Sequence, residues 1–128
     1  MLAIAFDWKE FIKFSEDLYA TKSDEASFRS AISRAYYGAF GAIRPYCVEQ
    51  FKISSKSNPE IHKIVINRLK TSSNKLEFST GNILSGLRDD RNNADYDSSF
   101  VVTKPLVNKT ITNSKNVIKN LEELREQL

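Results

Sequence analysis

One arginine of this sequence stands where a helix would carry an apolar side chain. On a helix of 3.6 residues per turn, four residues of the segment 82–95 fall within about 80° of one another. They are Leu84, Leu87, Arg91 and Ala94. A guanidinium on an apolar face is costly unless a carboxylate pairs with it or a phosphate binds to it. Asp95 lies one turn after Arg91, and Arg88 lies at the edge of the same face. Two interpretations stay open: a buried Arg91–Asp95 pair that stabilises the fold, or a phosphate-binding site.

Arg34 raises the same question in an earlier segment. It lies between Ile32 and Ala35, next to an apolar helix face and one turn before Gly38. A second arginine beside the groove that holds Arg91 would make an anion site. Alternatively, Arg34 spans the seam between two helices.

The sequence holds one histidine, His62, in the first turn of another expected helix and beside Ile61. As a general base it would need a partner and a groove. A histidine that simply packs at the start of a helix is the commoner case. The hydroxyls of Tyr36, Tyr37 and Tyr96 would find hydrogen-bond partners if they were buried.

Helical spacing of apolar residues recurs along the chain, and no long alternating stretch indicates a sheet. We expect helices that begin after Asp7, after Ser23 or Asp24, at Pro59, within 79–82 and at Pro105, separated by breaks at 22–25, 54–58, 71–74 and 97–99. Pro45 should kink the second helix or end its first part, with a continuation toward Phe51. The prediction is an all-α, up-down bundle of four to five helices that forms a single domain over residues 1–128.

Two further patterns concern packing. Gly38 and Gly41 should let another helix approach the second helix closely, because neither lies in the loop between a strand and a helix that a phosphate cradle needs. The last helix carries a stripe at alternating three- and four-residue spacing, made of Ser114, Val117, Leu121, Leu124 and Leu128. This stripe either closes its own bundle or forms a seam with a protein partner.

Composition excludes several classes of protein. The chain has 128 residues, 41% of them hydrophobic and 27% charged, as in ordinary globular domains. A single cysteine, Cys47, excludes an intrachain disulfide, and one histidine with one cysteine cannot form an ordinary structural zinc site. No apolar run approaches the roughly 18 residues of a membrane span, and the start MLAIAFDW lacks a basic region typical of signal peptides. We therefore expect a soluble cytoplasmic protein with no metal or other cofactor.

Charge is distributed unevenly along the chain, whose formal net charge is +3. The segment 52–75 holds six basic residues and one acid, Glu60. Such a stretch could contact nucleic-acid phosphates, or it could be a solvated helix face and loop. No aromatic residue is interleaved in the way that base stacking would require.

Four segments together resemble the HEPN superfamily of helical proteins. They are Trp8-x-x-Phe11-Ile12, the segment 25–40 with its block SRAYYGAF, His62, and the segment 87–97 with its block RNNADY. The resemblance spans nearly the whole chain and implies an α-helical bundle. It also implies a metal-independent endoribonuclease of a toxin–antitoxin or phage-defence system, acting as a homodimer with a cleft at the dimer interface. A minimal nucleotidyltransferase is the antitoxin-type partner that the resemblance implies.

Carried over residue by residue, the resemblance gives catalytic positions to Arg91, to the polar Asn92 after it and to Tyr96. Tyr96 stands where the family motif has histidine. A tyrosine with an unperturbed pKa near 10 is a poor base at neutral pH, but it can orient a phosphate. Contacts to RNA phosphate are expected from Arg88, Arg34 and Asp95. Nucleotidyl transfer to Tyr96 by a partner enzyme is a further hypothesis that the resemblance suggests.

Three hypotheses about function follow. The first is an RNA-binding HEPN protein with its site built on Arg91, which in the strong form of the hypothesis also cleaves RNA. The second is a catalytically inactive accessory subunit that binds a nucleotidyltransferase or another protein. The third is a nucleic-acid binder that uses only the segment 52–75, with no role for Arg91.

Overall fold

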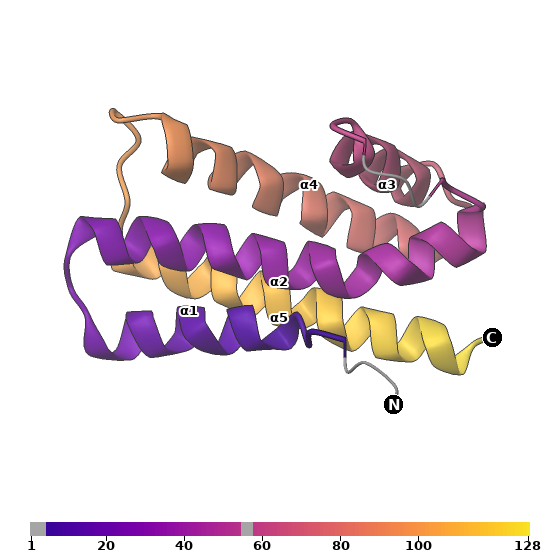
Figure 1. The fold of residues 1–128 in the computed structure, drawn as a ribbon, viewed down its shortest axis with the longest axis horizontal. Coiled ribbons are helices and arrows are strands. Elements are labelled where there is room, and N and C mark those ends of the chain that lie inside the picture. Colours follow the sequence, from indigo (N-terminus) through magenta and orange to yellow (C-terminus); the bar gives the residue numbers. More distant parts are fainter. Residues whose placement is uncertain (1–4, 55–57) are drawn as a thin grey trace.

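The computed structural model describes residues 5–54 and 58–128, and helices are the regular elements of these residues (Figure 1). They are α1 (Lys9–Thr21), α2 (Glu25–Phe51), α3 (Ile61–Lys70), α4 (Lys75–Tyr96) and α5 (Lys104–Glu126). No strand occurs in the two described ranges. The predicted all-α class is therefore confirmed. The first four residues and residues 55–57, including Lys56 of the basic segment, lie outside the described residues.

The four longer helices run alternately up and down, and α2 lies against each of the others (Figure 1). The shorter α3 packs mainly on α4 and also contacts α2. The order of the elements brings the C-terminal half of α2 beside both the start of α1 and α3. That junction holds the candidate site.

Side-chain caps set where α2, α4 and α5 begin. The Asp24 carboxylate accepts from the Ser27 amide at 3.0 Å, as expected for the start of α2. The Asn74 side chain accepts from the amides of Leu76 and Glu77, at 2.9 and 3.1 Å. This cap starts α4 at Lys75, so the predicted start within 79–82 was wrong by about one turn or more.

Two other predicted helix signals behave differently in the structure. Asp7 is not the N-cap of α1, because the cap position is Trp8 and no side chain caps it. The Asp7 carboxylate instead accepts from the Lys9 amide at 3.0 Å. Pro45 does not end α2, which continues to Phe51 as one helix.

The two predicted packing glycines are confirmed as sites of close helix contact. A Cβ atom on Gly38 would lie 2.7 Å from Cγ1 of Ile12, and one on Gly41 would overlap the Trp8 ring. Because neither position has room for a side chain, α1 packs directly on the backbone of α2. This contact places Trp8 at the edge of the groove described below.

The apolar stripe of α5 is mostly covered by the bundle itself. Ser114, Val117, Leu121 and Leu124 are buried, while Leu128 is exposed. The stripe therefore closes the chain's own core, and its buried members are not available as a seam for a partner. Among the described residues, no helix combines the length and apolar character needed to cross a membrane.

Candidate nucleic-acid interface

A groove of about 610 Å³ lies on the C-terminal half of α2, between the start of α1 and α3. Its walls combine aromatic rings with both signs of charge. The aromatic lining comes from Trp8, Tyr37, Phe40 and His62, and the charged lining from Arg44 and Glu49. Gly41, Pro45 and Val48 complete the surface. Aromatic faces beside basic groups are the usual ingredients of a surface that binds single-stranded nucleic acid.

His62 is held in the groove by α2. Its ring stacks on Phe40 with 4.1 Å between the ring centres, and its Nδ1 lies 2.6 Å from the Tyr36 hydroxyl. Tyr36 is fully buried and has no other hydrogen-bond partner among the described residues. Its O–H must therefore donate to Nδ1, since a buried hydroxyl hydrogen without an acceptor is costly. This tautomer leaves the second ring nitrogen, Nε2, as an N–H donor.

The charge state of His62 follows from its surroundings. Burial, together with the positive charges of Arg88, Arg91 and Arg44, lowers the pKa of His62 to about 4. The ring is therefore neutral at pH 7. Burial also raises the pKa of the Tyr36 phenol, so this hydroxyl keeps its proton.

Arg91 points into the bundle as its helical position predicted, and its side chain is 15% exposed. Its Nε donates to the Asp95 carboxylate at 3.0 Å, and its Nη1 donates to the Asn92 side chain at 2.7 Å. Its Nη2 donates to the Tyr37 hydroxyl. The Asp95 carboxylate also accepts from Ser33 at 3.2 Å. The expected Arg91–Asp95 pair therefore exists, and it ties α4 to the tyrosine that lines the groove.

Three other arginines near the groove have no polar partner among the described residues. The guanidinium carbon of Arg34 lies 5.1 Å from the Tyr37 ring centre, and that of Arg91 lies 4.9 Å from the same centre. Arg44 lines the groove directly. Arg88 is the clearest case, because its Nε is buried and has no hydrogen-bond partner among the residues that the structure describes. Arg34 and Arg91 thus both contact Tyr37. The positive charges of Arg88 and Arg44 act on His62 and help to lower its pKa.

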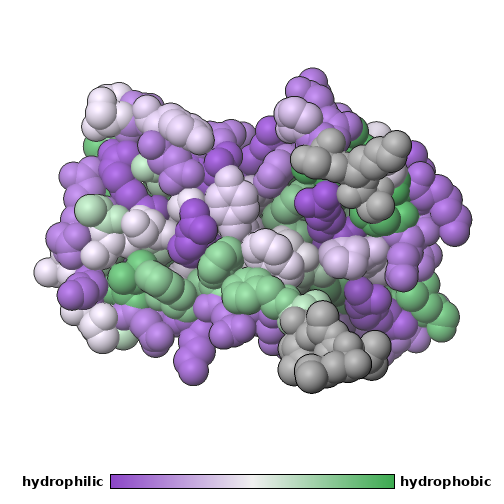
Figure 2. All heavy atoms as spheres, viewed as in Figure 1, coloured by the Kyte–Doolittle hydropathy of each residue, from purple (hydrophilic) through white to green (hydrophobic). Residues whose placement is uncertain are grey.

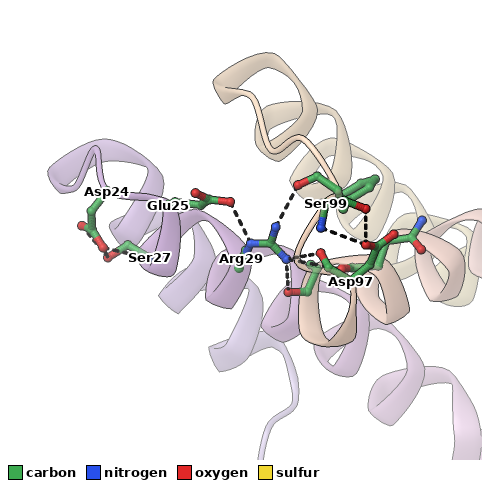
Figure 3. Close-up of polar contacts among 9 residues, drawn as sticks. Asp24, Glu25, Ser27, Arg29, Asp97 and Ser99 are labelled. Atoms are coloured by element: carbon green, nitrogen blue, oxygen red, sulfur yellow. Dashed lines mark hydrogen bonds and ion pairs between the residues drawn. The ribbon is translucent and has the colours of Figure 1, made fainter.

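Arg29 has the opposite environment at the other end of α2 (Figure 3). Its Nη1 donates to the carbonyls of Ala94 and Asp97 at 3.0 and 2.9 Å, and also reaches that of Asn93 at 3.4 Å. Its Nη2 donates to the Phe100 carbonyl at 2.8 Å, and its Nε pairs with Glu25 at 3.0 Å. Arg29 therefore holds the C-terminal end of α4 and the turn after it against α2.

None of the predicted site residues lines the groove itself, and Arg91 and Arg34 adjoin it only through Tyr37. The guanidinium groups of Arg91 and Arg34 both lie over the Tyr37 ring. The side chains of Asn92 and Asp95 accept hydrogen bonds from Arg91. The ring centre of Tyr96 lies 5.6 Å from the guanidinium carbon of Arg91. Tyr96 is nevertheless 77% exposed and does not line the groove.

Sequence reasoning missed the roles of Tyr37, Arg44, Glu49 and His62 in one groove. Tyr37 and His62 were visible as candidates, but their contacts join residues 26 and 54 positions apart in the chain. A periodicity within one helix carries no signal for such contacts.

Comparisons with protein-family models, with curated proteins and with solved structures give no match. The relation to the HEPN superfamily remains a prediction from the sequence. Within the described residues, no group of three or more histidine, cysteine, aspartate or glutamate side chains could hold a metal ion.

Proposed function

We propose that this protein binds single-stranded RNA in the groove between α1, α2 and α3, as a HEPN-like protein of a toxin–antitoxin or phage-defence system. The observation that carries the proposal is the set of arginines without polar partners beside an aromatic groove, with the buried Nε of Arg88 as its clearest member. A buried guanidinium nitrogen without a hydrogen-bond partner is costly in a protein that has no ligand for it. A phosphate would supply the missing acceptor.

The neutral state of His62 fits a phosphate-binding role. Its Nε2–H can donate to a phosphate oxygen without the cost of charging a partly buried ring among arginines. The same tautomer has no free ring lone pair, because Nδ1 already accepts from Tyr36. The geometry therefore supports RNA binding more directly than general-base cleavage by His62.

The test is a binding titration with labelled single-stranded RNA, followed by fluorescence anisotropy. We expect Arg44→Gln and Arg88→Gln each to weaken binding about 10-fold, because each removes a charge-assisted contact. Lys119→Gln is the matched control, since Lys119 is an exposed cation on α5. Lys63→Gln is a fifth protein, which tests the alternative that RNA binds to the basic segment. Equal affinity of all five proteins would contradict the proposal, and so would a loss confined to Lys63→Gln.

Cleavage is tested separately, because the proposed site includes Arg91 but lacks the usual motif histidine. The protein is incubated with total RNA, with and without chelator, beside Arg91→Ala and Tyr96→Phe. Chelator-resistant cleavage that Arg91→Ala abolishes would make the protein a metal-independent endoribonuclease, with Arg91 stabilising charge on the phosphate. Intact RNA with folded wild type would limit the function to binding.

A second candidate function is that of an accessory subunit that binds a nucleotidyltransferase or forms a homodimer. Apolar side chains gather along α1 on the face drawn in Figure 2. In and just before this helix, Phe6, Trp8 and Phe14 are exposed at 48%, 37% and 46%. Exposed aromatic residues in one region are typical of contact surfaces. Light scattering of the purified protein tests the homodimer, and co-purification from the native host tests the stoichiometric partner.

A further inference from the structure

Glu49 gives the groove a feature that phosphate binding does not explain. Its carboxylate lines the same groove as Arg44 and His62. Neither Glu49 nor Arg44 forms an ion pair or a hydrogen bond within the described residues. Because a carboxylate repels phosphate, Glu49 weakens a site that serves phosphate alone. A free acceptor and a free donor in one groove fit a ligand that presents donors and acceptors of its own.

The aromatic lining indicates what kind of ligand that is. Trp8 and Tyr37 are partly exposed beside the two charged groups, while Phe40 is buried behind the His62 ring that stacks on it. Unpaired bases of single-stranded RNA stack on exposed aromatic rings, and side chains then read the hydrogen-bonding edges of the base. Stacking alone accepts every base, so any selectivity comes from Glu49 and Arg44.

The chemistry of this pair matches guanine. A carboxylate only accepts hydrogen bonds, and guanine presents two adjacent donors, N1–H and the N2 amino group. Arginine donates, and guanine presents O6 and N7 as acceptors. Adenine lacks the N1–H donor, and uracil and cytosine lack the paired donors. We infer that the groove selects an unpaired guanosine of RNA, with Glu49 on its N1–H and N2 edge and Arg44 on O6 or N7.

This inference rests on the proposed RNA binding and is tested so that the two can fail separately. The probes are oligouridylates of one length that carry a single central guanosine, inosine or adenosine, titrated against the whole protein. We expect guanosine to bind about 10-fold more tightly than adenosine, with inosine between them because it lacks the N2 amino group. Equal binding of all three probes would overturn the guanine inference while leaving RNA binding intact. No binding of any probe would overturn both.

Variants of the protein test whether Glu49 causes the preference for guanosine. Glu49→Gln should remove the preference for guanosine without weakening the binding of plain oligouridylate, because stacking and phosphate contacts remain and the repulsion between carboxylate and phosphate is lost. Glu123→Gln, an exposed carboxylate on α5, is the matched control and should keep the preference. Arg88→Gln should weaken all probes by the same factor. A guanosine preference that survives Glu49→Gln would overturn the assignment to Glu49.

Guanine also occurs in free nucleotides, and a competition experiment distinguishes RNA from free guanine nucleotides as the ligand of the groove. Guanosine monophosphate is added to the complex with the guanosine-containing oligomer. We expect it to compete at least about 10-fold more weakly than unlabelled oligomer, because it lacks the neighbouring phosphates. Competition at equal concentration would show that the groove is a site for free guanine nucleotides and would overturn its assignment to RNA.

Discussion

At the N-terminal end of α2, the Arg29 guanidinium donates to four backbone carbonyls and to the Glu25 carboxylate. Further along the same helix, Arg34 and Arg44 have no polar partner among the described residues, and Arg88 on α4 has a buried Nε without a partner among them. The two regions use the same chemical group. In the first, the protein satisfies every nitrogen of the guanidinium, so nothing is left for a ligand. In the second, the protein itself provides no hydrogen-bond acceptor for these guanidinium groups within the described residues.

This comparison separates stability from binding. A satisfied arginine should matter to the free energy of unfolding and not to a ligand. An unsatisfied arginine should matter to the ligand and little to unfolding, because burial of an unpaired polar atom is itself a cost. Each of the following experiments is chosen to break this division or to make it sharper.

Substitution of Arg29 should have the largest effect. Arg29→Ala removes charge-assisted bonds to the last carbonyls of α4 and to the turn at Asp97, which anchors that turn through Ser99 at 2.9 Å. We expect a loss of about 3 kcal/mol in the free energy of unfolding, measured by urea denaturation. RNA affinity per folded molecule should not change. A loss below about 0.5 kcal/mol would mean that water replaces Arg29 at these carbonyls, and the comparison would fail.

Arg88→Met should have the next largest effect, and this effect should be on RNA affinity and not on the free energy of unfolding. The thioether side chain fills similar apolar space and removes the unpartnered Nε, so stability should stay constant or rise by up to about 1 kcal/mol. RNA binding should weaken about 10-fold, which corresponds to about 1.4 kcal/mol. Both quantities are measured on one preparation. Strong destabilisation without loss of binding would place Arg88 with Arg29 among the structural arginines.

The pH dependence of stability tests the environment of His62. Its pKa falls from about 6.5 in the unfolded chain to about 4 in the fold. The unfolded state therefore binds more protons between these values, so stability is complete above pH 6.5 and declines as pH falls toward 4. Because the ring is partly exposed, we expect a loss on the order of 1 kcal/mol across this range.

His62→Gln is the control for this decline. The amide oxygen can still accept from the Tyr36 hydroxyl, but the side chain does not titrate. The variant should therefore hold a nearly constant free energy of unfolding over the same range. An unchanged decline in His62→Gln would assign it to carboxylates instead. Asp24 and Asp97 have pKa values lowered by their hydrogen bonds to Ser27 and Ser99, and they act below this range.

The sequence predicted the features that depend on one helix at a time. The 3.6-residue period placed Arg91 on the inner face of α4, and the small residues Gly38 and Gly41 predicted close contact with another helix, which in the structure is α1. The sequence also limited the cap of α2 to Ser23 or Asp24 and placed a break before α4. Each of these depends on residues that are neighbours along the chain or share one helix face.

Features that join distant segments could not be predicted in this way. The Tyr36–His62 bond and the Arg91–Tyr37 bond depend on how α3 and α4 dock on α2, and no periodicity encodes that docking. Arg29 was missed for a different reason: its partners are backbone carbonyls, which every residue carries, so they leave no signature in the sequence. The start of α4 was misplaced because Asn74 was assigned to the break at 71–74, although asparagine is a preferred N-cap residue and Glu77 follows it at the spacing typical of a helix start.

The smallest expected effect concerns salt. Each phosphate contact to single-stranded nucleic acid adds about 0.7 to the slope of log affinity against log salt. Arg88→Gln should therefore reduce that slope by about 0.7, and Lys63→Gln in the basic segment should leave it unchanged. If Lys63→Gln changes the slope and Arg88→Gln does not, RNA lies along the exposed face of α3 and the groove is bypassed. The unpaired arginines would then have no ligand on this surface, and their difference from Arg29 would need another cause.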